Sequence, residues 1–83
     1  MIELILYTRA GCHLCDEMKA GLLAARPPLA FKLTEIEVGW EGGLAEKYGQ
    51  LVPLLEMAGE EICHYFLDEA RLNAALARGC PAD

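Results

Sequence analysis

The feature that most constrains the fold of this chain is a short apolar run, Ile-Glu-Leu-Ile-Leu-Tyr, at residues 2–7. Thr8 and Gly11 bound the run, and it is rich in large and β-branched side chains. Such a composition predicts a strand that is buried on both faces. Strands of this kind belong to sheets that carry covering layers on both sides.

A helix is predicted directly after this strand, over His13–Ala25. Leu14, Met18 and Leu22 recur at four-residue intervals, which places them on one face of a helix. The Pro-Pro pair at 27–28 then ends the helix, because proline cannot continue the backbone hydrogen bonding.

A second strand is predicted over residues 31–38, but its alternation shifts along its length. Phe31 and Leu33 share one face, whereas Ile36 and Val38 fall on the other. Either a β-bulge or an exposed edge would explain the shift.

Two further helices are predicted. The first spans residues 41–48, with Gly49 as its C-terminal cap. The second begins after Asp68, whose side chain is a good N-cap, and is closed by Gly79 and Pro81.

Between these helices, Pro53–Met57 and Ile62–Phe66 predict a β-hairpin. Its turn is expected over residues 58–61, with Gly59 supplying the necessary backbone freedom. The predicted element order is therefore β-α-β-α-β-β-α.

This order predicts an α/β fold. The first β-α-β unit implies a right-handed crossover between parallel strands, and the hairpin adds an antiparallel pair. We expect a four-stranded mixed sheet with helices on both faces. With 83 residues, 54% of them hydrophobic, and neither a linker nor a repeat, the chain is expected to form one domain over residues 1–83.

The charge balance argues against several partners. Seven Lys and Arg residues against 13 Asp and Glu residues give a net charge of −6, so we expect neither nucleic acid nor membrane binding. The N-terminus lacks the positive region of a signal peptide. We expect a cytoplasmic monomer whose cysteines stay reduced unless they are catalytic or metal-bound.

Cys12 and Cys15 lie at the junction between the first predicted strand and the first predicted helix. A spacing of three is weak evidence by itself, but this position in a β-α-β unit is typical of a redox pair. The free N–H groups at a helix N-terminus favour a thiolate at Cys12, which is the predicted nucleophile. Cys15 lies one turn further on and is the predicted resolving thiol.

Four other side chains near this motif have two interpretations each. His13 and Arg9 either add positive charge beside Cys12 or are simply solvent-exposed. Trp40 and Tyr7 either border a functional surface or pack at the ends of their elements, and packing is the favoured interpretation for a lone aromatic at a junction.

A zinc site would need two ligands in addition to Cys12 and Cys15. Cys63 and His64 are adjacent on a predicted strand and would point to opposite faces, so no metal is expected. Cys63 is expected to be a small buried side chain, and Cys80 an exposed thiol near the C-terminus.

Three stretches resemble the glutaredoxin-like branch of the thioredoxin fold. They are the tyrosine-ended strand leading into residues 7–11, the Cys-His-Leu-Cys motif at 12–15, and Leu-Val-Pro at 51–53. The closest likeness is to a bacterial set of glutaredoxin-like proteins in which Gly-Cys-His-Leu-Cys is typical.

The resemblance implies roles for four residues around the cysteines. Pro53 would be cis and lie beside the cysteines, and the backbone of Val52 would pair with substrate or glutathione. Arg9 would contact a carboxylate, since it stands where many glutaredoxins have lysine. With His13, these are the expected substrate-binding residues.

Two departures bear on the cosubstrate. His13-Leu14 replaces the usual Pro-Tyr, and residues 62–66 replace a Gly-Gly pair that lets the backbone approach glutathione. Glutathione is therefore left open as a cosubstrate, and no resident cofactor is expected.

The first functional hypothesis is a thiol-disulfide oxidoreductase that acts on a disulfide-containing protein or a small-thiol substrate. The alternatives are a non-enzymatic binding module that keeps the same fold, and a carrier of an iron–sulfur cluster or zinc.

Overall fold

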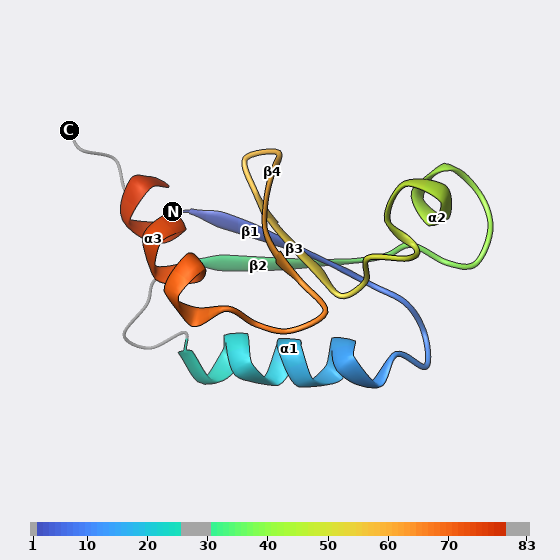
Figure 1. Cartoon of the computed structure of the whole chain (residues 1–83), viewed down its shortest axis with the longest axis horizontal. Helices are drawn as coiled ribbons and strands as arrows, with labels where there is room; N and C mark the ends of the chain where they lie inside the picture. Colours follow the sequence, from blue (N-terminus) through green and yellow to red (C-terminus); the bar gives the residue numbers. More distant parts are fainter. Residues whose placement is uncertain (1, 26–30, 80–83) are drawn as a thin grey trace.

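The computed structural model describes residues 2–25 and 31–79. Its elements follow the predicted order (Figure 1): β1 (Glu3–Thr8), α1 (His13–Ala25), β2 (Lys32–Glu37), α2 (Gly43–Tyr48), β3 (Leu54–Met57), β4 (Glu60–His64) and α3 (Glu69–Gly79). The expected helix-ending prolines at 27–28, and Cys80 and Pro81, lie outside the described residues. Among the helices that are described, none is long and apolar enough to cross a lipid bilayer.

The four strands form one mixed sheet in the order β2-β1-β3-β4. β1 runs parallel to β2 and antiparallel to β3, and β4 pairs antiparallel with β3. The mixed sheet is therefore as predicted, and β1 is hydrogen-bonded along both edges.

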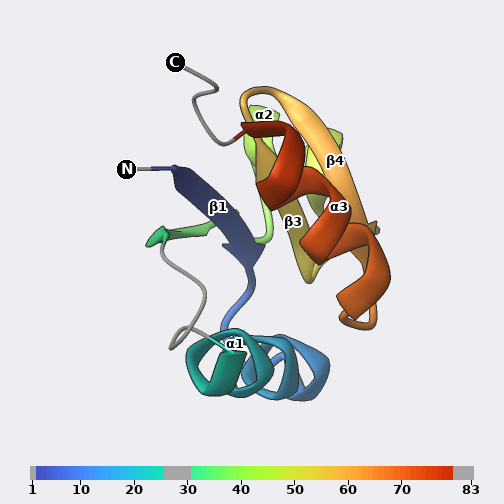
Figure 2. The same cartoon turned by 90° about the vertical axis from the view of Figure 1, so that its left-hand side faces the viewer.

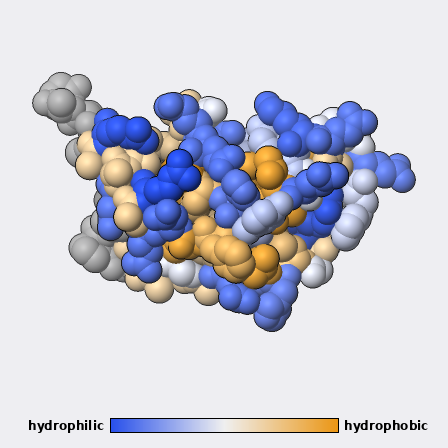
Figure 3. Space-filling model, in the orientation of Figure 1, coloured by the Kyte–Doolittle hydropathy of each residue, from blue (hydrophilic) through white to orange (hydrophobic). Residues whose placement is uncertain are grey.

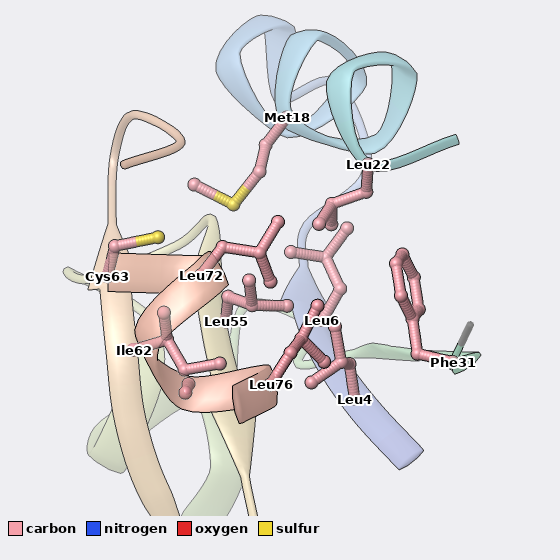
Figure 4. Packing of buried hydrophobic residues seen from close by; sticks show 11 residues of the cluster. Leu4, Leu6, Met18, Leu22, Phe31, Leu55, Ile62, Cys63, Leu72 and Leu76 are labelled. Carbon is pink, nitrogen blue, oxygen red and sulfur yellow. The ribbon is translucent and has the colours of Figure 1, made fainter. Parts of the chain in front are cut away.

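The larger apolar layer lies between the sheet and the helices α1 and α3. Leu4 and Leu6 of β1 are fully buried there, together with Met18 and Leu22 of α1 and Leu72 of α3. Figure 4 shows these side chains pointing toward one another. Figure 2 shows α1 below β1 and α3 beside β3 and β4.

A smaller layer covers the opposite face at the α2 end of the sheet. Tyr7 of β1 stacks on Tyr48 of α2, with ring centroids 4.0 Å apart, and Val38 and Leu54 complete the buried set. The side chains of successive β1 residues thus pack into opposite layers, which confirms that this strand is buried on both faces.

The shift of alternation in β2 arises because β2 is an edge strand. Phe31 and Leu33 contact the larger layer, whereas Ile36 and Val38 contact the smaller one. The pairing of β2 with β1 is continuous from one end of β1 to the other, so no bulge is involved. Of the two predicted explanations, the exposed edge is correct.

The helix α2 is shorter than predicted, since it begins at Gly43 rather than at residue 41. Gly42 has a φ of 100°, which lies outside the helical region. The predicted start was wrong because residues 41 and 42 cannot join a helix in that conformation.

The hairpin turn contains two residues, Ala58 and Gly59, with φ values of 52° and 85°. Two-residue hairpin turns of the favoured type need positive φ at both central positions. Glu60 and Glu61 therefore belong to β4, which ends at His64. The predicted four-residue turn and the predicted strand end at residue 66 were wrong, because alanine does not signal a positive φ.

The predicted N-cap of α3 is confirmed. The Oδ1 atom of Asp68 accepts a hydrogen bond of 3.0 Å from the backbone N–H of Arg71, and the Asp68 carbonyl accepts one from the N–H of Leu72. The carboxylate thus satisfies an N–H group that has no partner inside the helix.

We expect Ala58→Asn to stabilise the protein by about 1 kcal/mol, because asparagine adopts positive φ with less strain than alanine. The measurement is the urea midpoint of unfolding, which should rise. Ala58→Val is the contrasting variant, and its β-branched side chain should lower the midpoint. An unchanged or lower midpoint for Ala58→Asn would contradict the observed turn.

Candidate active site

A tight turn connects β1 to α1 and sets the position of Cys12. The backbone N–H of Cys12 donates to the carbonyl of Arg9 at 3.0 Å, and Gly11 has a φ of 80°. A positive φ at the third residue of a turn favours glycine. The turn follows Thr8, which is buried, so its starting point is fixed by the sheet.

Cys12 and Cys15 form a close pair at the start of α1. Their sulfur atoms lie within disulfide distance and their Cα atoms are 5.2 Å apart. The backbone N–H of Cys15 donates to the Sγ atom of Cys12 at 3.1 Å, so this sulfur acts as the helix cap. Cys12 is half-buried, whereas Cys15 is only 3% exposed. The pair therefore presents one accessible sulfur and one shielded sulfur.

Cys12 opens onto a groove of about 360 Å³. The turn before α1 supplies Arg9, the loop between β2 and α2 supplies Trp40, and the segment between α2 and β3 supplies Gly49 and Val52. The fold therefore brings together Cys12 and two of the four predicted substrate-binding residues, Arg9 and Val52.

Arg9 is held by two contacts from the β2–α2 loop. Its Nε atom donates to the carbonyl of Gly39 at 3.0 Å, and its guanidinium lies 4.1 Å from the ring centroid of Trp40. The second contact is a cation–π interaction. Trp40 is itself 70% exposed, so the favoured packing interpretation was wrong. Sequence reasoning missed its role because the contact joins two loops far apart in the chain.

Gly49 lies against the same guanidinium, at the end of α2. Gly49 is the C-terminal cap of α2, as predicted, and its backbone N–H donates to the carbonyl of Ala45; its φ of −57° is right-handed rather than left-handed. A Cβ atom at this position would collide with the carbonyl of Ala45 and with the guanidinium of Arg9. Glycine is needed here for close approach rather than for a special backbone angle.

Val52 and Pro53 come directly before β3, and Val52 lines the same groove as Cys12. The peptide bond between them is cis, and the Pro53 side chain is fully buried. Val52 is half-buried and lines the groove. Within residues 2–25 and 31–79, neither the N–H nor the carbonyl of Val52 has a hydrogen-bond partner. These two backbone groups are therefore available to a ligand.

His13 lies outside the groove. Its side chain is 89% exposed, and its Nε2 atom is 3.4 Å from the Glu17 carboxylate one turn along α1. The structure therefore does not bring the His13 side chain together with the other predicted binding residues.

Cys63 and His64 face in opposite directions, as expected for neighbours on a strand. Cys63 is buried in the larger layer, and this burial raises the pKa of its thiol. His64 is exposed and pairs with Glu61 at 2.7 Å. In the described part of the chain, no three His, Cys, Asp or Glu side chains are grouped so that they could hold a metal ion.

The Tyr7 hydroxyl points toward the neighbouring strand β3. It donates to the Oε1 atom of Glu56 at 3.1 Å. Contact with Tyr48, burial, and the Glu56 carboxylate all raise the pKa of Tyr7. The interpretation of Tyr7 as packing at the end of its strand is the correct one.

Comparison with known proteins agrees with this geometry. The model of the Glutaredoxin-like domain (DUF836) family matches residues 3–77. The protein Rv0508 of Mycobacterium tuberculosis is 33% identical over 94% of this chain and 89% of its own length. The solution structure of protein Ne2328 from Nitrosomonas europaea is 37% identical, covers 89% of each chain and superposes with a TM-score of 0.76.

A more distant structure shares the fold alone. Oxidised thioredoxin O1 from Arabidopsis thaliana is 15% identical over 94% of this chain and 77% of that chain, with a TM-score of 0.58. The fold is therefore thioredoxin-like, as predicted. Within that class, the chain belongs to the glutaredoxin-like domain family, which confirms the resemblance seen in its motifs.

We expect Gly49→Ala to destabilise the protein by about 1–3 kcal/mol, because the added methyl group overpacks the contact with Ala45 and Arg9. The matched control is Gly43→Ala in the same helix, where an added Cβ meets no atom within 4 Å. It should be neutral or slightly stabilising, since alanine favours helix. Equal urea midpoints for the two variants would contradict the close approach at Gly49.

The raised pKa of Tyr7 predicts a pH effect on stability. The folded protein keeps this proton above about pH 10, where the unfolded chain loses it. The stabilisation is therefore complete below about pH 10 and declines above it, by up to about 1.4 kcal/mol per pH unit. Urea unfolding between about pH 9 and pH 11 should show a steeper decline for the wild type than for Tyr7→Phe. Parallel declines would contradict the prediction.

Proposed function

We propose that this protein is a thiol-disulfide oxidoreductase. The observation that carries the proposal is the Cys12–Cys15 pair at the N-terminus of α1, with one accessible and one shielded sulfur. The N–H of Cys15 points at the Cys12 sulfur, which favours its thiolate form in the reduced protein.

In the proposed reaction, the Cys12 thiolate attacks one sulfur of a substrate disulfide. A mixed disulfide forms with Cys12, and the other substrate sulfur leaves as a thiolate. Cys15 then loses its proton and attacks the Cys12 sulfur. The second substrate thiolate leaves, and the Cys12–Cys15 disulfide remains. Two electrons pass from the protein to the substrate, and an external thiol reductant restores the dithiol.

The groove provides two groups that would hold the substrate beside Cys12. Arg9 uses its Nε atom for Gly39 and keeps its terminal N–H groups for a carboxylate, which a guanidinium can bind with two hydrogen bonds. The unpaired backbone of Val52 offers one donor and one acceptor to an extended chain. Because the Arg9 guanidinium is held by Gly39 and Trp40, and Val52 is joined to the buried Pro53, these groups are in place before the substrate arrives.

The test is to trap the mixed disulfide. Cys15→Ser removes the resolving thiol, so incubation with a model disulfide should leave a stable adduct on Cys12, found by mass spectrometry of the proteolysed protein. The matched control Cys12→Ser keeps the shielded thiol and should give little or no adduct at Cys15. If Cys15→Ser carries no adduct on Cys12, the proposed function is wrong.

A further inference from the structure

Tyr65 fastens the segment that carries Val52 and Pro53. Its backbone N–H donates to the carbonyl of Pro53 at 2.8 Å. Its hydroxyl donates to the carbonyl of Gln50 at 2.5 Å. A single residue that follows β4 therefore holds both ends of residues 50–53, which lie within the segment between α2 and β3 (Figure 1).

The backbone of Tyr65 is strained in order to make these contacts. Its φ of 66° lies in the left-handed region, which costs a residue with a Cβ atom roughly 1–2 kcal/mol. The ring also contacts His64 edge to face, with centroids 4.6 Å apart. A strained tyrosine beside a functional segment is the arrangement expected where a side chain has a role that glycine would not fill.

The segment that Tyr65 holds includes Val52, which lines the groove at Cys12 and whose backbone N–H and carbonyl have no hydrogen-bond partner among the described residues. A substrate with its own peptide groups can pair with both of them, in the manner of an added β-strand. A small disulfide without a peptide backbone gains nothing from this segment. The contribution of Tyr65 should therefore depend on the class of substrate.

The surface next to Tyr65 also suits a polypeptide. Phe66 is 68% exposed, and with Leu14, Met18 and Leu67 it lines a second pocket of about 310 Å³ between α1 and the segment before α3. Figure 3 shows apolar side chains gathered over α1 and this segment, with hydrophilic residues around them. Because Leu14 lies between the two cysteines, an apolar side chain near a substrate disulfide can reach this pocket.

We propose that Tyr65 is a positioning residue that fixes the Val52 backbone for an extended polypeptide disulfide. The inference rests on the proposed function and names its substrate class. Tyr65 takes no part in the exchange of electrons, which passes through Cys12 and Cys15.

The experiment compares two disulfide probes that release the same leaving group. One is an extended peptide whose cysteine is linked to 2-thiopyridine, and the other is 2-mercaptoethanol linked to 2-thiopyridine. Tyr65→Phe removes the hydrogen bond from the hydroxyl to the Gln50 carbonyl and keeps the aromatic ring. It should lower the rate constant for the peptide probe about three- to ten-fold, and that for the small probe less than about two-fold.

The matched control is Thr34→Val. It removes the hydrogen bond from the Thr34 hydroxyl to the Glu3 carboxylate, which lies outside the groove. Both of its rate constants should equal those of the wild type. If Tyr65→Phe slows both probes equally, or slows neither, the positioning role is overturned.

A second measurement separates this inference from the proposed function. Amide hydrogen exchange measures how firmly Tyr65 holds residues 50–53, and it requires no reaction at the cysteines. Two backbone amides report on this segment: that of residue 65, which donates to the Pro53 carbonyl, and that of Leu51, which donates to the Tyr48 carbonyl. In Tyr65→Phe, both amides should exchange with solvent several-fold faster. Unchanged exchange overturns the positioning role whatever the reactivity. A wild type that reacts with neither probe overturns the proposed function, whereas a wild type that reacts with both probes, with unchanged exchange in Tyr65→Phe, overturns the positioning role alone.

Discussion

The structure depends on the complete enclosure of β1. This strand is hydrogen-bonded to β2 on one edge and to β3 on the other. Leu4 and Leu6 are buried in the larger layer, and Tyr7 is buried in the smaller one. Because both edges and both faces are engaged, the end of β1 has no freedom to shift. The turn that begins after Thr8 is therefore fixed in position, and so are Arg9 and Cys12 within it.

The parts of the fold that local signals determine were predictable from the sequence. The helix over His13–Ala25 has the predicted bounds, because its apolar residues recur at one helical spacing. Asp68 caps α3 as expected, because the preference of aspartate for that position is local chemistry. The position of the cysteines at a strand-to-helix junction follows from the same kind of pattern.

The remaining features depend on contacts between distant segments. Nothing in the residues near Trp40 indicates that Arg9 will lie over its ring, since 31 positions separate them. The requirement for glycine at position 49 arises partly from the guanidinium of Arg9, which approaches from another element and adds to the close contact with the Ala45 carbonyl in the same helix. Ala58 gave no local sign of its positive φ, which the pairing of β3 with β4 imposes. In each case a tertiary contact decided the local conformation.

The two apolar layers are unequal, and the groove lies between elements that belong to different layers. The helix α1, which contains Cys15 and directly follows Cys12, is anchored in the larger layer by Met18 and Leu22. The helix α2 has six residues, and Tyr48 is its one buried side chain. Sub-global opening on the α2 side exposes less apolar surface than global unfolding and therefore requires less free energy. The two sides of the groove therefore differ in how much buried apolar surface anchors them: α1 is held by the larger layer, whereas α2 is held by the smaller one.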